Sequence, residues 1–123
     1  MDREEYMELA LQLAREAAKA GEVPVGCVIA DENGKIIGSG RNRREEEHDA
    51  SAHAEMEAIR MACDAVGDWR LSGCTIFVTL EPCPMCAGGI INSRIPTVVF
   101  GGVKAQQSAD LLKSFFNEKR TSH

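Results

Sequence analysis

The chain has 123 residues, of which 44% are hydrophobic and 27% charged, and its formal net charge is −5. This length suits one domain with a buried core, residues 1–123, and is too short for two. The negative charge excludes a globally positive surface, so any contact with nucleic acid must be local. No apolar stretch approaches a membrane span and the start lacks the order of a signal peptide, so we expect a cytoplasmic protein without a membrane partner.

The hydrophobic pattern predicts eight elements. In chain order they are a helix over 2–20, strands over 23–30 and 36–40, a helix over 48–67 that begins at about Ser51, a strand over 74–80, a helix from Pro84 to about Ser93, a strand over 97–102 and a helix over 106–119. Asp2 and Glu5 have the spacing of a capping box, and Asn33-Gly34 is typical of a hairpin turn. This order predicts a layered α/β domain, in which an antiparallel hairpin is extended by parallel strands.

The sheet is predicted to have four strands, with residues 97–102 at its edge. A parallel fifth strand needs a crossover of a dozen or more residues. The interval between Phe100 and Leu111 is too short for a crossover helix and another strand. Either the apolar side of the final helix or a second chain would then cover this edge. The apolar residues of that helix are Leu111, Leu112, Phe115 and Phe116.

Two cysteines lie where a predicted strand leads into a predicted helix, in the stretch TLEPCPMC. Pro84 suits the first helical position, so Cys83 would lie near the N-cap and Cys86 in the first turn. The unpaired N–H groups of a helix start favour a thiolate. Five cysteines in a cytosolic chain argue for thiols and a metal before disulfides. The pair alone leaves a metal site and a redox disulfide both open.

A third ligand for a metal would be His53. The chain has three histidines, of which His123 is terminal and His48 lies in a polar loop. His53 falls in the first turn of a predicted helix, as Cys86 does. If the two helix starts point at one spot, they supply an imidazole and two thiolates and leave a fourth tetrahedral position for water, which is the pattern of a catalytic zinc. A simple helix cap is the alternative for His53.

Glu55 follows His53 by two residues in the stretch HAE. Side chains two residues apart diverge on a regular helix, so both can reach one site only where the helix meets it end-on. A carboxylate beside a zinc-bound water can accept its proton, as hydrolysis requires. The alternative is an ordinary acidic residue favoured by the helix dipole.

Three basic groups are candidates for a local contact with nucleic acid. They are the run RNRR at 41–44, Arg94 with Lys104, and residues 113–120. Such groups are more typical of a solvated surface.

The motif HAE followed by PCPMC resembles the signature of the zinc-dependent cytidine and deoxycytidylate deaminase superfamily. Within it, the stretches EVPVGCVI, GSGRN, HDASAHAE, TLEPCPMC and LLKSFF resemble bacterial tRNA-specific adenosine deaminases. The resemblance extends from residue 6 to about 119. It implies a three-layer α/β/α fold of the cytidine-deaminase type with a mixed sheet, and a homodimer.

The resemblance also implies roles for particular residues. One zinc ion per protomer would be held by His53, Cys83 and Cys86, and Glu55 would move protons as adenosine becomes inosine. Four residues would bind the base or sugar, and they are Asn42, Ala54 through a free backbone N–H, and Val25 and Leu80 as pocket walls. Without the resemblance, Val25 and Leu80 fit an ordinary core and Asn42 a turn.

The substrate implied by the resemblance is the wobble adenosine of a tRNA anticodon, splayed out as single-stranded nucleic acid. Two alternatives stay open. One is a deaminase of another base, such as cytosine in single-stranded DNA or a nucleoside, or guanine. The other is a zinc-stabilised binding module without catalysis, against which Glu55 and the open ligand position argue.

The chain departs from the family after the strand that ends near Phe100. Members of the family have a longer segment before the final helix, which lines part of the substrate cleft. Here Gly101-Gly102-Val103 leads almost at once into KAQQSADLLKSFF. We expect this difference to leave the metal ligands intact, to weaken tRNA affinity and to loosen substrate choice.

Overall fold

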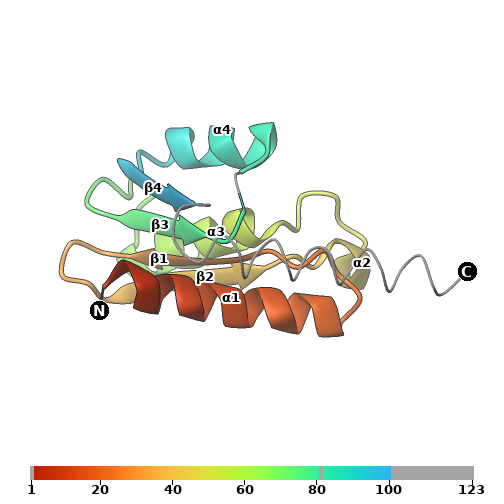
Figure 1. Ribbon diagram of the computed structural model, residues 1–123. Helices are drawn as coiled ribbons and strands as arrows, with labels where there is room; N and C mark the ends of the chain where they lie inside the picture. Colours follow the sequence, from red (N-terminus) through yellow and green to blue (C-terminus); the bar gives the residue numbers. More distant parts are fainter. Residues whose placement is uncertain (1, 81, 101–123) are drawn as a thin grey trace, which may run out of the picture.

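The computed structural model describes residues 2–80 and 82–100 (Figure 1). Its elements in chain order are α1 (Arg3–Lys19), β1 (Gly26–Ala30), β2 (Ile36–Arg41), α2 (Arg44–Glu47), α3 (Ala54–Val66), β3 (Thr75–Val78), α4 (Pro84–Asn92) and β4 (Thr97–Phe100). The predicted helix over 106–119 and its apolar residues lie outside the described residues, as do positions 101 and 102 of the last predicted strand.

The strands of the described residues form one mixed sheet of four, in the order β2-β1-β3-β4. β1 pairs antiparallel with both β2 and β3, and β3 pairs parallel with β4. A mixed sheet of four strands is confirmed for residues 2–80 and 82–100, but the parallel pairing begins one strand later than expected. The reason is that the crossover through α3 places β3 beside β1 and not beside β2. Within the described range, β3 is the only strand that pairs with β4.

Helices cover both faces of the sheet, which confirms the three-layer α/β/α architecture (Figure 1). On one face, α1 packs its buried residues against Val28 and Phe77, and the rings of Tyr6 and Phe77 stack with their centroids 4.6 Å apart. On the other face, α3 and α4 enclose the larger core with Ile29 and Ile76. No helix in the described part of the chain is long and apolar enough to cross a membrane.

The predicted capping box of α1 is present, because Asp2 Oδ1 accepts a hydrogen bond from the Glu5 N–H at 2.9 Å. By contrast, α3 begins at Ala54 and not near Ser51. The Asp49 side chain accepts hydrogen bonds from the N–H and the hydroxyl of Ser51 at 2.8 and 2.7 Å. This local turn competes with the helix and delays its start. Consequently His53 is the N-cap residue of α3.

Helix α3 lies unusually close to β2. A Cβ atom at Gly38 would collide with the carbonyl oxygen of Ala58, and one at Gly40 would collide with that of Ala54. The two glycines therefore let the backbone of the helix approach the strand. This close contact sets the distance between the first turn of α3 and strand β2, and so positions the residues of that turn.

Candidate metal centre and substrate cavity

The first turns of α3 and α4 meet at one end of the sheet. His53 is the N-cap residue of α3, Cys83 is the N-cap residue of α4, and Cys86 lies in the first turn of α4. The Nδ1 atom of His53 lies 3.6 Å from Sγ of Cys83 and 3.5 Å from Sγ of Cys86. All three ligand atoms lie within 4.8 Å of one another. The structure thus brings together the three residues predicted from spacing.

These distances fit a tetrahedral zinc site. Zinc lies about 2.3 Å from a thiolate sulfur and about 2.0–2.1 Å from an imidazole nitrogen, so tetrahedral angles put the two ligand atoms about 3.6 Å apart. Both observed nitrogen–sulfur distances agree with this value. His53 makes no capping hydrogen bond through its side chain, which removes the alternative of a simple helix cap. All five cysteines are free thiols.

The protein environment of the ligands affects their protonation. Burial, and then the positive charge of Arg44, lower the pKa of His53, which favours the neutral imidazole that binds metal. Burial, and then the charge of Glu55, raise the pKa of the Cys86 thiol. A metal ion must displace the proton of this thiol, so metal binding releases protons.

Glu55 lies in the first turn of α3 and is 4% exposed. Burial raises the pKa of its carboxyl group. Although Glu55 and His53 are two residues apart, both line the same cavity, because the helix meets that cavity end-on. The cavity is lined by Val23, Val25, Asn42, Arg44, His53, Glu55, Leu80 and Cys83. A buried carboxyl group therefore lies next to a three-ligand metal site with space in front of it.

Asn42 is 5% exposed, and its Oδ1 atom accepts a hydrogen bond from the backbone N–H of Ala54 at 2.9 Å. The expectation that this N–H is free for a base is therefore wrong. Ala54 is fully buried and is absent from the residues that line the cavity. Because Oδ1 is engaged, the Nδ2 group of Asn42 is the part left to face the cavity, and it can only donate.

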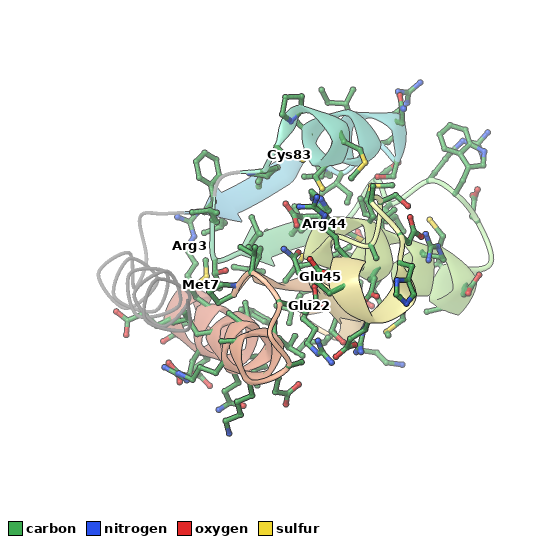
Figure 2. All side chains as sticks on the ribbon, turned by 90° about the vertical axis from the view of Figure 1, so that its right-hand side faces the viewer. Arg3, Met7, Glu22, Arg44, Glu45 and Cys83 are labelled. Carbon is green, nitrogen blue, oxygen red and sulfur yellow. The ribbon has the colours of Figure 1, made fainter. Side chains whose placement is uncertain are left out.

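Of the other predicted pocket residues, Val25 and Leu80 both line the cavity, and Leu80 is 39% exposed. Sequence reasoning missed Arg44 as a residue of this cavity, and it missed the short helix α2 from which Arg44 extends. Four residues are too few to show a helical period, and the basic run 41–44 was the only available signal. Figure 2 shows Arg44 between the ribbon of α2 and the end of α4 that carries Cys83, with Glu22 and Glu45 close by.

Comparison with known proteins agrees with this site. Residues 1–102 match the family described as the cytidine and deoxycytidylate deaminase zinc-binding region. The tRNA-specific adenosine deaminase of Bacillus subtilis is 46% identical over 119 residues, which cover 96% of this chain and 73% of that protein.

Two solved structures have a similar fold. One comes from a study of A-to-I editing by tRNA:A34 deaminases at the wobble position of transfer RNA, with 46% identity, a TM-score of 0.78, and coverage of 81% of this chain and 76% of that one. The other is the guanine deaminase of Bacillus subtilis, with 36% identity, a TM-score of 0.79, and coverage of 96% and 76%.

Proposed function

The chain belongs to the cytidine and deoxycytidylate deaminase zinc-binding family, and on that premise we propose that it deaminates adenosine to inosine in tRNA, at the wobble position of the anticodon. The observation that carries this proposal is the 46% identity with a tRNA-specific adenosine deaminase over nearly the whole chain. The experiment that tests this proposal must therefore identify the substrate of this chain.

His53, Cys83 and Cys86 are placed to hold the zinc ion of this family, and we expect one ion per protomer. A zinc ion with three protein ligands supplies an activated water molecule as the nucleophile for hydrolysis. The protein contributes the neutral imidazole, the two sulfur ligands and a cavity that admits the base.

Glu55 is the proposed catalytic acid and base. Its carboxylate would accept a proton from the attacking water and transfer it to the ring nitrogen of adenine. It would then accept the second proton, from the hydroxyl group added to the ring carbon, and transfer it to the amino group, which leaves as ammonia while the C–O bond becomes a carbonyl. Support comes from its position beside the metal ligands and from its burial, which raises the pKa of the carboxyl group and makes it a stronger proton acceptor.

The base would be bound by the walls of the same cavity. Asn42 would donate from Nδ2 to an acceptor on the base or the sugar, and Val25 and Leu80 would contact the faces of the ring. Ala54 would act indirectly, because its N–H orients the amide of Asn42. This arrangement uses one polar contact for orientation and apolar contacts for burial, as small-molecule pockets commonly do.

The experiment that tests this function is a substrate panel for the zinc-loaded protein. It contains an anticodon stem-loop RNA with adenosine at the wobble position, the same RNA with guanosine there, single-stranded DNA with adenine and cytosine, free adenosine, cytidine and guanine. We expect inosine from the first RNA, at a kcat/KM above that of every other substrate. A higher kcat/KM for any other member of the panel would contradict the proposal.

One other function has specific support. The structure of a guanine deaminase matches 96% of this chain with 36% identity. Hydrolysis of a purine amino group could use the same kind of metal-activated water and acid–base residue. If the protein converts free guanine to xanthine and forms no inosine from the RNA, this second function is favoured.

We further propose that the 123 residues form a single domain that works in the cytoplasm as a homodimer. The free thiols fit a reducing compartment. An apolar groove between α4 and β4 supports self-association, because Ile91 is 67% exposed there, Phe100 is 40% exposed, and β4 has one side without a described partner. Light scattering coupled to gel filtration measures the oligomeric state.

A further inference from the structure

The basic run at 41–44 contains three arginines with different surroundings. Arg41 donates from Nη2 to Glu46 Oε1 at 3.0 Å, and its side chain is 12% exposed. Arg43 donates from Nε to Glu57 Oε2 at 3.0 Å and from Nη1 to Glu46 Oε2 at 3.2 Å. Two of the three guanidinium groups are therefore engaged with carboxylates of the protein itself, and the carboxylate of Glu46 is shared between them.

Arg44 differs from both. Its guanidinium makes no hydrogen bond or ion pair with another residue in 2–80 or 82–100, and it lines the cavity that holds His53 and Glu55. Figure 2 shows its side chain in the space between α2 and Cys83. Five N–H donors are thus available at the cavity wall.

The position of Arg44 is fixed by Glu22, a residue more than twenty positions earlier in the chain. Glu22 is 1% exposed, and its two carboxylate oxygens accept hydrogen bonds from the backbone N–H groups of Glu45 and Glu46 at 3.1 and 2.9 Å. Helix α2 has no side-chain cap of its own, so Glu22 takes this role from outside the helix. The N–H of Arg43 also donates to the carbonyl of Ala52 at 2.8 Å, which ties α2 to the loop before His53.

We propose that Arg44 binds a phosphate group of the substrate beside the catalytic cavity, and that Glu22 is the positioning residue that holds Arg44 there. A planar guanidinium matches the oxygens of a phosphate through paired hydrogen bonds. A free base has no anionic group for this residue, whereas a nucleotide within an RNA has a phosphate on each side of its sugar. Arg44 is therefore a specificity-determining residue that selects a polynucleotide over a free base or nucleoside. This inference rests on the proposed function.

The first test compares Arg44→Ala with the parent protein, both loaded with zinc. Two quantities are measured: the ratio of kcat/KM for the anticodon stem-loop to kcat/KM for free adenosine, and the salt dependence of RNA binding by fluorescence anisotropy. We expect the ratio to fall by about tenfold to 100-fold. The slope of log affinity against log salt should become shallower by about 0.7, the value for one lost phosphate contact on a single strand.

Two variants serve as controls. Arg70→Ala removes the same charge after the opposite end of α3, where Arg70 is 58% exposed, and should leave both quantities at the parent values. Arg44→Lys keeps the charge but not the paired donors, so it should keep the salt slope and recover part of the ratio. If Arg44→Ala matches Arg70→Ala in both quantities, Arg44 binds no phosphate. If the parent makes no inosine from the RNA, the proposed function fails instead.

The second test concerns Glu22. Glu22→Gln replaces one acceptor by a donor that faces a backbone N–H, so hydrogen exchange of the Glu45 and Glu46 amides should rise. The substrate ratio should fall in the parent background and show no further fall in the Arg44→Ala background. Glu22→Asp keeps the charge on a shorter side chain. It should change the hydrogen exchange and the substrate ratio in the same directions, but by smaller amounts. An equal fall of the ratio in both backgrounds, for either variant, would show that Glu22 does not act through Arg44.

Discussion

The start of α1 and the starts of α3 and α4 use the same backbone geometry in different ways. At α1, Asp2 and Glu5 satisfy each other's backbone N–H groups within one turn. At α3 and α4, the N-cap residues are His53 and Cys83, and neither makes a capping hydrogen bond through its side chain. Residues that commonly stabilise a helix start are thus replaced, at the site, by residues that bind a metal.

A helix start that carries a metal ligand in place of a capping side chain is less stable, because the lost capping bond costs about 0.5–2 kcal/mol. At α3 part of this cost is offset from a distance, since Asn42 accepts the hydrogen bond of the first helical N–H. At α2, the carboxylate of Glu22 accepts hydrogen bonds from two N–H groups of the first turn in the same way. Side chains from outside the helix therefore cap α2 and α3, and at α3 the N-cap position itself is left for a metal ligand.

The largest effect should come from removing a ligand at these N-caps. His53→Ala, Cys83→Ala and Cys86→Ala should each lose the bound zinc and all measurable deamination, because two protein ligands seldom retain zinc. Metal content is measured by mass spectrometry of the purified protein. The matched control is Cys63→Ala, a partly exposed cysteine of α3 outside the site, which should keep a full complement of zinc. Full zinc content in Cys83→Ala would remove the proposed metal centre.

The next effect concerns Glu55, the second residue after the N-cap of α3. Glu55→Gln should keep the zinc content and the thermal midpoint within a few degrees of the parent. Its kcat should fall by about 10²–10⁴-fold, because the amide cannot accept or return a proton. Single-turnover kinetics on the anticodon stem-loop would measure this. A kcat near that of the parent would exclude Glu55 as the catalytic base.

A smaller effect should appear when a ligand is converted into an ordinary cap. His53→Ser and His53→Ala both lose the imidazole, but serine can accept a hydrogen bond from the first turn of α3. Urea unfolding of the two variants in the presence of a chelator should give a free energy of unfolding about 1 kcal/mol higher for the serine variant. Equal values would mean that Asn42 already supplies all the capping that α3 can use.

The smallest effect is expected at α1. Asp2→Ala should lower the free energy of unfolding by about 0.5 kcal/mol, because this cap is exposed and close to the chain start. Zinc content and kcat/KM should stay at the parent values. A loss of zinc in this variant would show that the cap of α1 and the metal-binding helix starts are coupled and do not act separately.

The same contrast explains what could be predicted from the sequence. The α1 cap, the Asn33-Gly34 turn and the Cys83–Cys86 pair are local patterns, and each was found from residues at most three positions apart. The bond from Ala54 to Asn42 spans twelve positions, and those to Glu22 span more than twenty. Such bonds depend on how β1, β2 and α3 pack, which no local pattern encodes.

Two further differences have the same origin. The late start of α3 follows from the turn between Asp49 and Ser51, in which side-chain hydrogen bonds outweigh helix propensity. The antiparallel pairing of β3 with β1 follows from the side of the hairpin on which the crossover returns. The metal ligands could be predicted despite these errors, because histidine and cysteine at the start of a helix are recognisable from the residue types alone.

The close approach of α3 to β2 has a consequence for how sequences of this kind can diverge. Positions 38 and 40 accept no side chain, since even a methyl group at either would meet a backbone carbonyl oxygen of the helix. A side chain at Gly40 would push the first turn of α3 away from the strand and move His53 relative to the two cysteines of α4, and one at Gly38 would push on the following turns. These two glycines do not line the cavity. They should nevertheless be among the positions least free to vary during evolution. A saturation library at Gly40 should yield few or no zinc-binding variants.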